Sequence, residues 1–284
     1  MRKVPNTDVA FRIFAYTMLT CCMASHIVAW RPAFAEELEL TGSFIQGGLV
    51  QGHTDPAARV VFKGREVRVS PDGLFLLGFN RDEPSTASLI ITLPNGHQKT
   101  ETLSIGQREY DIQRIDGLPP GKVSPSKQNL ARIRAEAALV REARTRDEAR
   151  TDFEEGFIRP VEGRISGVYG SQRILNGQAR RPHFGIDIAA PAGTPVRAPA
   201  SGIVTMVYPD MFFSGGTLIL DHGHGLSSSF LHLQRILVAR GDYIRRGDVI
   251  AHVGATGRVT GAHLDWRINL FKTRLDPALL VSFD

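Results

Sequence analysis

Residues 261–268, near the C-terminus, read Gly-Ala-His-Leu-Asp-Trp-Arg-Ile. Side chains alternate between the two faces of a β-strand, so His263 and Asp265 would share one face, with Leu264 and Trp266 on the other. An imidazole and a carboxylate then lie on one surface, and an apolar pair anchors the strand from behind. The segment predicts a strand with an apolar inner face and a polar face that can carry chemistry.

A second segment repeats this pattern. Residues 183–187 read His-Phe-Gly-Ile-Asp, which again places an imidazole and a carboxylate in an apolar extended run. Zn²⁺ accepts both imidazole nitrogen and carboxylate oxygen, so two such pairs on strand-like segments could close a metal site. Either pair alone is equally typical of a surface histidine and aspartate on an edge strand. The prediction of a metal site therefore depends on both pairs.

A third histidine lies in residues 227–233, which read Ser-Ser-Ser-Phe-Leu-His-Leu. A lone histidine between apolar neighbours, such as His232, is most often a core residue whose hydrogen bonds are satisfied. Taken with His263, it could instead supply an imidazole beyond the metal ligands. A metal lowers the pKa of its water toward roughly 7, and a nearby imidazole can take the proton and stabilise the transition state. The three segments together are what metal-assisted hydrolysis needs.

The surrounding sequence is typical of β structure. From residue 156 onward, short apolar runs alternate with glycine turns without helical periodicity, which predicts a compact antiparallel β domain over residues 156–284. Residues 36–118 also carry short apolar runs, separated by hairpin signals such as Asp72-Gly73 and Asn95-Gly96. We expect a small immunoglobulin-like β-sandwich there, serving as a binding or spacer module. The predicted fold class is mainly β.

Residues 119–155 form the predicted connection between these domains. Pro119-Pro120-Gly121 interrupts the chain, and residues 127–155, dense in Ala, Arg and Glu, predict a charged linker helix with a short apolar stripe. A solvated helix packed on one domain is favoured over a coiled-coil partner or a flap above the active site.

Residues 1–35 are predicted to be a signal peptide. A basic start leads into a largely apolar stretch and then Ala33-Phe34-Ala35, an A-x-A-type cleavage site; an uncleaved anchor is the less favoured alternative. Cys21 and Cys22, the two cysteines of the chain, lie inside this segment, so the mature protein would carry no disulfide and no cysteine nucleophile. Removal of residues 1–35 takes away four Lys or Arg and one Asp and lowers the net charge from +5 to +2, which argues against nucleic-acid binding. We expect a periplasmic protein without stable membrane insertion.

Residues 160–277 resemble the catalytic domain of the lysostaphin/LytM-type zinc metallo-endopeptidases, which cut peptidoglycan peptides. The markers of that family are an H-x-x-x-D motif, a later H-L strand motif and a C-terminal H-x-H motif. Here they read His183-Phe-Gly-Ile-Asp187, Leu-His232-Leu and His263-Leu-Asp265. The resemblance implies a small, mostly antiparallel β domain with a narrow groove across its sheet.

By this resemblance, His183 and Asp187 would be Zn²⁺ ligands. His232 and His263 would be the catalytic imidazoles, which polarise the scissile carbonyl and activate water. Asp265 stands where the family usually has its third ligand, a histidine. A carboxylate oxygen binds Zn²⁺ at about 2.0–2.2 Å, close to the distance of an imidazole nitrogen, so Asp265 could take that place. In the other interpretation the site is degenerate.

The resemblance implies a zinc endopeptidase that hydrolyses peptide cross-links in the cell wall, with the D-alanyl–diaminopimelate bond as the expected target. Its partners would be peptidoglycan peptide stems and, through the N-terminal module or the helix, a regulatory protein. Arg173, Arg258 and Arg267 could contact a substrate carboxylate or simply be solvated. The alternative is a catalytically degenerate member that activates cell-wall amidases or binds peptidoglycan. Bound zinc would not separate the two functions, but hydrolysis would.

Overall fold

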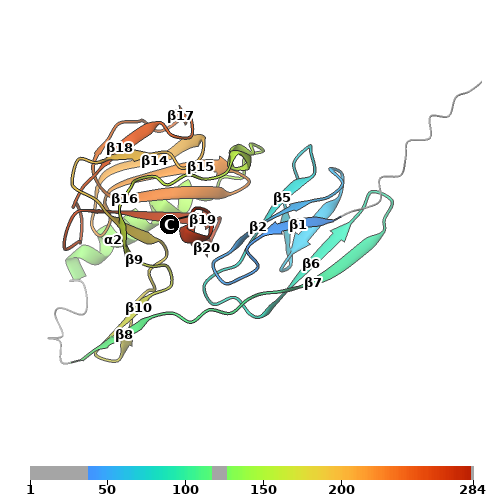
Figure 1. Ribbon diagram of the computed structural model, residues 1–284, viewed down its shortest axis with the longest axis horizontal. Coiled ribbons are helices and arrows are strands. Elements are labelled where there is room, and N and C mark those ends of the chain that lie inside the picture. The colour runs from blue at the N-terminus through green and yellow to red at the C-terminus, as the bar shows by residue number, and fades with distance from the viewer. Residues whose placement is uncertain (1–37, 117–126, 283–284) are drawn as a thin grey trace, which may run out of the picture. The chain divides into compact units, whose positions relative to one another are not determined.

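The computed structural model describes residues 38–116 and 127–282 (Figure 1). Strands dominate these ranges and pair mostly antiparallel, which confirms the prediction of a mainly β fold. The predicted signal peptide lies outside the described residues. Within them, neither α2 nor either of the short 3₁₀ helices has the length and apolar character that a bilayer crossing requires.

Residues 39–104 form two sheets around one apolar core. Along one strand the buried residues are Ala87, Leu89 and Ile91, and the residues between them are more exposed, as expected for a sheet with one face inward. The first sheet contains β1 (Glu39–Gly42), β2 (Leu49–His53) and β5 (Leu74–Gly78); the second contains β4 (Arg65–Val67), β3 (Arg59–Phe62), β6 (Thr86–Thr92) and β7 (Gln98–Ser104). Because β4 pairs with β3, the fourth strand lies in the second sheet, whereas the constant-type immunoglobulin order places it beside the fifth strand.

The next strand does not join the sandwich. β8 (Ile112–Ile115) pairs in parallel with β10 (Gln172–Leu175), which also pairs with β11 (Gln178–Ala179). The end of the N-terminal region is therefore hydrogen-bonded to a segment that follows residue 156.

The connecting helix is shorter than the sequence predicts. α2 covers Lys127–Ala143, and residues 144–151 are not helical before the 3₁₀ turn η1 (Asp152–Glu155). The prediction of a charged helix over residues 127–155 is wrong in this part because the charged residues bind the neighbouring strands. The Arg144 guanidinium donates to Ser229 Oγ at 2.7 Å, and the Glu148 carbonyl accepts from the His224 backbone N–H at 2.8 Å.

The C-terminal region is built on one large sheet with the strand order β17-β14-β15-β16-β19-β12-β9, to which β13, β18 and β20 are added. The strands are β9 (Arg164–Gly167), β12 (Ile186–Ala189), β13 (Pro195–Arg197), β14 (Gly202–Met211), β15 (Gly215–Gly223), β16 (Leu226–Ile236), β17 (Tyr243–Ile244), β18 (Val249–Val253), β19 (His263–Leu270) and β20 (Thr273–Leu275), followed by η2 (Pro277–Leu279). Leu264, Trp266 and Ile268 of β19 are fully buried in the apolar core. The residues between them face the opposite side of the sheet, and the candidate site lies there.

Part of that opposite side is covered by α2. Val140 and Ala143 pack against an apolar cluster formed by Met206, Met211 and Ile219 of β14 and β15. The helix thus covers β14 and β15. The histidines and aspartates discussed above lie on or beside other strands, β12, β16 and β19.

Candidate metal centre

The two aspartates of the predicted metal site are direct cross-strand partners. β12 and β19 pair antiparallel with Asp187 opposite Asp265, and paired residues point to the same face with Cβ atoms about 4.5–5.5 Å apart. On its other side, Asp187 is paired with Gly167 of β9. A Cβ atom at position 167 would lie 2.2 Å from Asp187 Oδ2, so glycine leaves the space that this carboxylate occupies. The sheet register alone therefore brings both carboxylates together.

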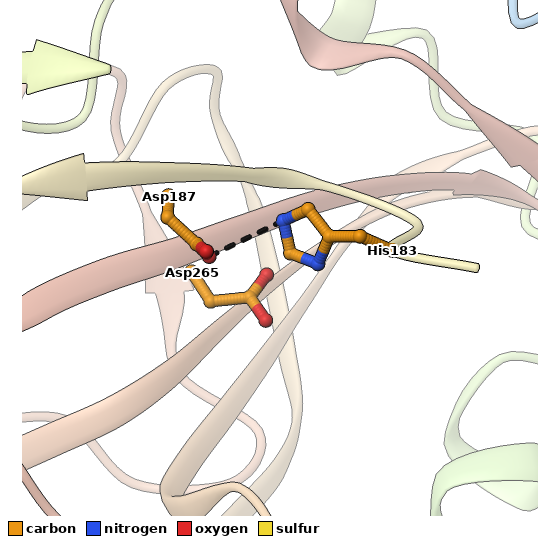
Figure 2. A group of neighbouring side chains, drawn as sticks. All are labelled: His183, Asp187 and Asp265. Atoms are coloured by element: carbon orange, nitrogen blue, oxygen red, sulfur yellow. Dashed lines mark ion pairs between the residues drawn. The ribbon is translucent and has the colours of Figure 1, made fainter. Parts of the chain in front are cut away.

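His183 approaches the same point from the loop before β12. Its backbone N–H donates to the Ser171 carbonyl at 2.8 Å, and its Nε2 lies 3.2 Å from Asp187 Oδ1. One ligand atom from each of His183, Asp187 and Asp265 lies within 4.8 Å of the others, and Figure 2 shows the three side chains converging.

Two polar atoms at this point lack a hydrogen bond. His183 Nε2 and Asp187 Oδ1 are buried and, among the described residues, neither forms a hydrogen bond despite their 3.2 Å separation. An unsatisfied buried polar atom costs about 1–3 kcal/mol. A cation between them would satisfy both at once, so this donor set fits Zn²⁺. That these residues bind an ion stays a prediction.

Asp265 has a cationic partner that the family motif does not assign. The Arg267 guanidinium forks over its carboxylate, with Nε 2.9 Å from Oδ1 and Nη2 2.5 Å from Oδ2. Burial alone would raise the pKa of Asp265, but the charge and hydrogen bonds of Arg267 outweigh it and hold the pKa below its ordinary value. Arg267 is therefore an ion-pair partner of Asp265 and not simply a solvated side chain. The period of two along β19 could have identified it, since positions 265 and 267 share a face.

His232 reaches the site through an unusual backbone conformation. It lies in β16 with φ +65°, a left-handed conformation that costs a non-glycine residue about 1–3 kcal/mol. Its neighbour Leu231 already faces the Asp265 side, so strict alternation would turn His232 toward the core. The left-handed residue reverses this, and the His232 and His263 ring centroids lie 4.8 Å apart.

The hydrogen bonds of both rings leave the same nitrogen available. Nδ1 of His232 donates to the Thr256 carbonyl at 2.9 Å, and Nδ1 of His263 donates to the Gly261 carbonyl at 3.0 Å. In the neutral rings Nε2 then carries the lone pair, and burial lowers the pKa of His232, which favours its neutral form. Nε2 of His263 lies 3.7 Å from Asp187 Oδ1. The two imidazoles thus lie beside the candidate metal site, and in each the Nδ1 atom is occupied by a backbone carbonyl.

His222 has a structural position away from these groups. It is fully buried, and its ring bridges the Ser201 carbonyl (2.6 Å from Nδ1) and Ser228 Oγ (2.7 Å from Nε2). Burial, only partly offset by the Ser201 hydrogen bond, lowers the pKa of His222 to about 4. The neutral ring therefore joins β15 to β16 and to the residue before β14.

Acidification should weaken the fold through His222. Its folded-state pKa is below the unfolded value of about 6.5, so its contribution is complete above pH 6.5 and is lost as the pH falls toward 4, by about 3 kcal/mol in all. Urea unfolding at pH 7 and pH 4.5 measures this loss. The variant His222→Gln, which can keep a donor and an acceptor, should show a smaller difference between the two pH values. An equal difference in both proteins would contradict the assignment.

Comparison with known proteins shows to which family this chain belongs. The family model for Peptidase family M23 matches residues 181–277, which contain all five residues of the candidate site. A crystal structure of a Pseudomonas aeruginosa protein assigned to peptidase M23 is 30% identical, covering 84% of this chain and 95% of that chain with a TM-score of 0.66. This chain belongs to peptidase family M23. The resemblance drawn from the three motifs is confirmed.

Two bacterial relatives of this M23 peptidase have named activities. The peptidoglycan DD-endopeptidase ShyB of Vibrio cholerae is 35% identical over 144 residues, or 49% of this chain and 34% of ShyB. The DD-carboxypeptidase/endopeptidase Mpg of Neisseria meningitidis is 41% identical over 108 residues, or 37% of this chain and 25% of Mpg. The chain thus aligns with about a third or less of each of these relatives.

Proposed function

We propose that this chain is a zinc-dependent endopeptidase that hydrolyses peptide cross-links of peptidoglycan, with the D-alanyl–diaminopimelate bond as its target. The observation that carries the proposal is the convergence of His183, Asp187 and Asp265 within 4.8 Å, with two buried polar atoms that lack a hydrogen bond. The substrate class is supported by the named activities of ShyB and Mpg.

The proposed roles follow from the geometry. His183, Asp187 and Asp265 would hold the metal, which when bound supplies a Lewis acid for the scissile carbonyl and makes water a better nucleophile. His232 and His263, with Nε2 unprotonated, would take the proton from the attacking water and return it to the leaving amine. The left-handed backbone at His232 keeps its ring on the side of the sheet where the peptide must bind.

The proposed setting is the periplasm, which the predicted signal peptide supports. Peptide stems of peptidoglycan would be the substrate there. The sandwich and α2 are the parts of the chain through which a regulatory protein would act. Both parts connect to the site. The segment after α2 reaches Ser229 on β16, next to the strand that carries Asp265. Arg81 of the N-terminal module donates to the carbonyl of Gly170, whose N–H donates to the His183 carbonyl.

Digestion of purified cell wall tests the activity. The chain without residues 1–35 should convert cross-linked peptide dimers of peptidoglycan to monomers, which are counted after the glycan strands are digested with a muramidase. It should lose this activity with a chelator and regain it with Zn²⁺. Mass spectrometry of the new termini identifies the cleaved bond. A zinc-loaded protein that leaves the cross-links of walls of defined cross-linking intact would contradict the proposal.

The ion pair between Asp265 and Arg267 favours a second candidate, a non-catalytic family member. If the guanidinium occupies Asp265 permanently, the site has only two donors left for an ion. Such a protein would bind peptidoglycan without cleaving it, or increase hydrolysis by an added amidase. A wall-binding assay and an amidase assay with the added chain separate this candidate from the enzyme.

A further inference from the structure

We propose that Arg267 is a positioning residue of the metal centre, which shares Asp265 with the ion and sets the net charge of the loaded site. This inference rests on the proposed function, because it assigns Arg267 a role toward the Zn²⁺ that the site fits. It concerns the position where this chain departs from the family motif.

The contacts define the pair tightly. Arg267 approaches Asp265 through Nε and Nη2, so the guanidinium plane covers one edge of the carboxylate. The Asp265 side chain is 3% exposed and that of Arg267 is 26% exposed, so the pair is largely shielded from water. Each carboxylate oxygen has two lone pairs, so the fork leaves acceptor capacity on Asp265, and one of its oxygens lies within 4.8 Å of the ligand atoms of His183 and Asp187.

The local sequence makes room for this pair. Gly185, between the two residues of the H-x-x-x-D motif, is buried against β19. A Cβ atom there would lie 2.8 Å from Asp265 Oδ1, 2.5 Å from Arg267 Cγ and 2.5 Å from the Trp266 carbonyl oxygen. Glycine therefore admits both the carboxylate and the guanidinium stem that supports it.

The charges explain why an arginine belongs there. Two histidines and one aspartate around a dication leave a net charge of about +1, whereas one histidine and two aspartates leave about zero. The Arg267 guanidinium restores the missing positive charge beside the second carboxylate. In the metal-free protein the same guanidinium keeps buried Asp265 from being an unpaired charge, which otherwise destabilises a fold strongly.

If the ion and Arg267 share Asp265, removing Arg267 should change zinc affinity, stability and hydrolysis in defined directions. The ion and Arg267 are both cations and compete for one carboxylate, so removing the guanidinium should strengthen zinc binding while it weakens the metal-free fold. A fully loaded site without Arg267 would be less positively charged and should hydrolyse more slowly. A residue with only a structural role would instead weaken zinc binding and activity together.

Zinc affinity and thermal unfolding of the mature chain test the inference. In Arg267→Gln, competition with a chromophoric chelator should show zinc bound about tenfold more tightly, a typical coupling between two sites. The zinc-induced rise in Tm should be larger than in wild type, and kcat for wall peptides should fall. Arg267→Lys keeps the charge and should have nearly wild-type zinc affinity.

Two further variants act as controls. Arg274→Gln removes another largely buried arginine, whose Nη1 donates to Asn269 at 3.2 Å rather than to Asp265, and should leave zinc affinity unchanged. In an Asp265→Asn background, Arg267→Gln should no longer tighten zinc binding. Equal or weaker zinc binding by Arg267→Gln would overturn the inference. If wild type binds zinc but does not cleave cell wall, the proposed activity fails while the zinc measurements still decide the role of Arg267.

Discussion

Replacing His263 with alanine is expected to lower hydrolysis of cross-linked peptidoglycan by about 10²–10⁴-fold and to leave zinc content near one ion per chain. The His263 ring lies 4.8 Å from that of His232, and its Nδ1 is occupied by the Gly261 carbonyl. Its available Nε2 is thus placed for proton transfer beside the three predicted ligands. His232→Ala should give the same result, because each imidazole contributes separately to moving the proton.

Activity and metal content must be measured on the same samples. His53→Ala, in the exposed end of β2, provides a histidine substitution away from the site and should change neither quantity. Loss of zinc from His263→Ala would show that His263 and Asp265 have exchanged roles. The structure is compatible with this outcome, since His263 Nε2 is only 3.7 Å from Asp187 Oδ1.

Asp187→Asn is expected to weaken zinc binding at least 100-fold and to reduce hydrolysis to background. The amide keeps the shape of the side chain but removes the anionic oxygen that lies 3.2 Å from His183 Nε2. It also removes the negative charge that would face a dication, and outer contacts cannot replace a lost ligand. Isothermal titration with Zn²⁺ and a cell-wall digest measure the two effects.

The fold itself should survive this substitution. Asp187 is opposite Asp265, so losing one of two adjacent carboxylates relieves like-charge repulsion in the metal-free protein. Thermal unfolding without metal should therefore occur at or above the wild-type temperature. Asp210→Asn, at a 75% exposed side chain, is the matched control for an aspartate without a ligand role. Unchanged zinc affinity in Asp187→Asn would mean that the convergence seen here holds no ion.

The sequence could predict most of the placement because period-two alternation determines it. His263 and Asp265 lie on one face of the strand and the apolar Leu264 and Trp266 on the other, as alternation predicts, and the antiparallel pairing puts Asp187 opposite Asp265. Two details of the site were not predicted from the sequence. The left-handed backbone at His232 reverses alternation at one residue, which no local pattern indicates. The sequence predicts Arg267 as a substrate contact or a solvated residue, whereas its spacing of two from Asp265 puts both residues on one face, where they form an ion pair.

The predicted end of the helix was wrong for a different reason. Residues 144–151 are so rich in charge that their sequence predicts a solvated helix, yet two of their arginines bind residues of distant strands. Arg150 binds the Asp221 carboxylate on β15, and Arg144 is so buried that its pKa falls well below its ordinary value. Burial is the main cause of this lowered pKa, and repulsion from Arg274 and Arg267 lowers the pKa further. Partners separated by more than 70 residues are invisible to helical periodicity.

The packing of α2 on the sheet decides where a shortened protein can begin. A fragment cut at the start of the β domain, at residue 156, would uncover Met206, Met211 and Ile219 together with the polar groups that Arg144 and Arg150 now satisfy. An exposed apolar patch of this kind promotes self-association. A minimal catalytic fragment for biotechnology should therefore start before α2, although the family match begins only at residue 181.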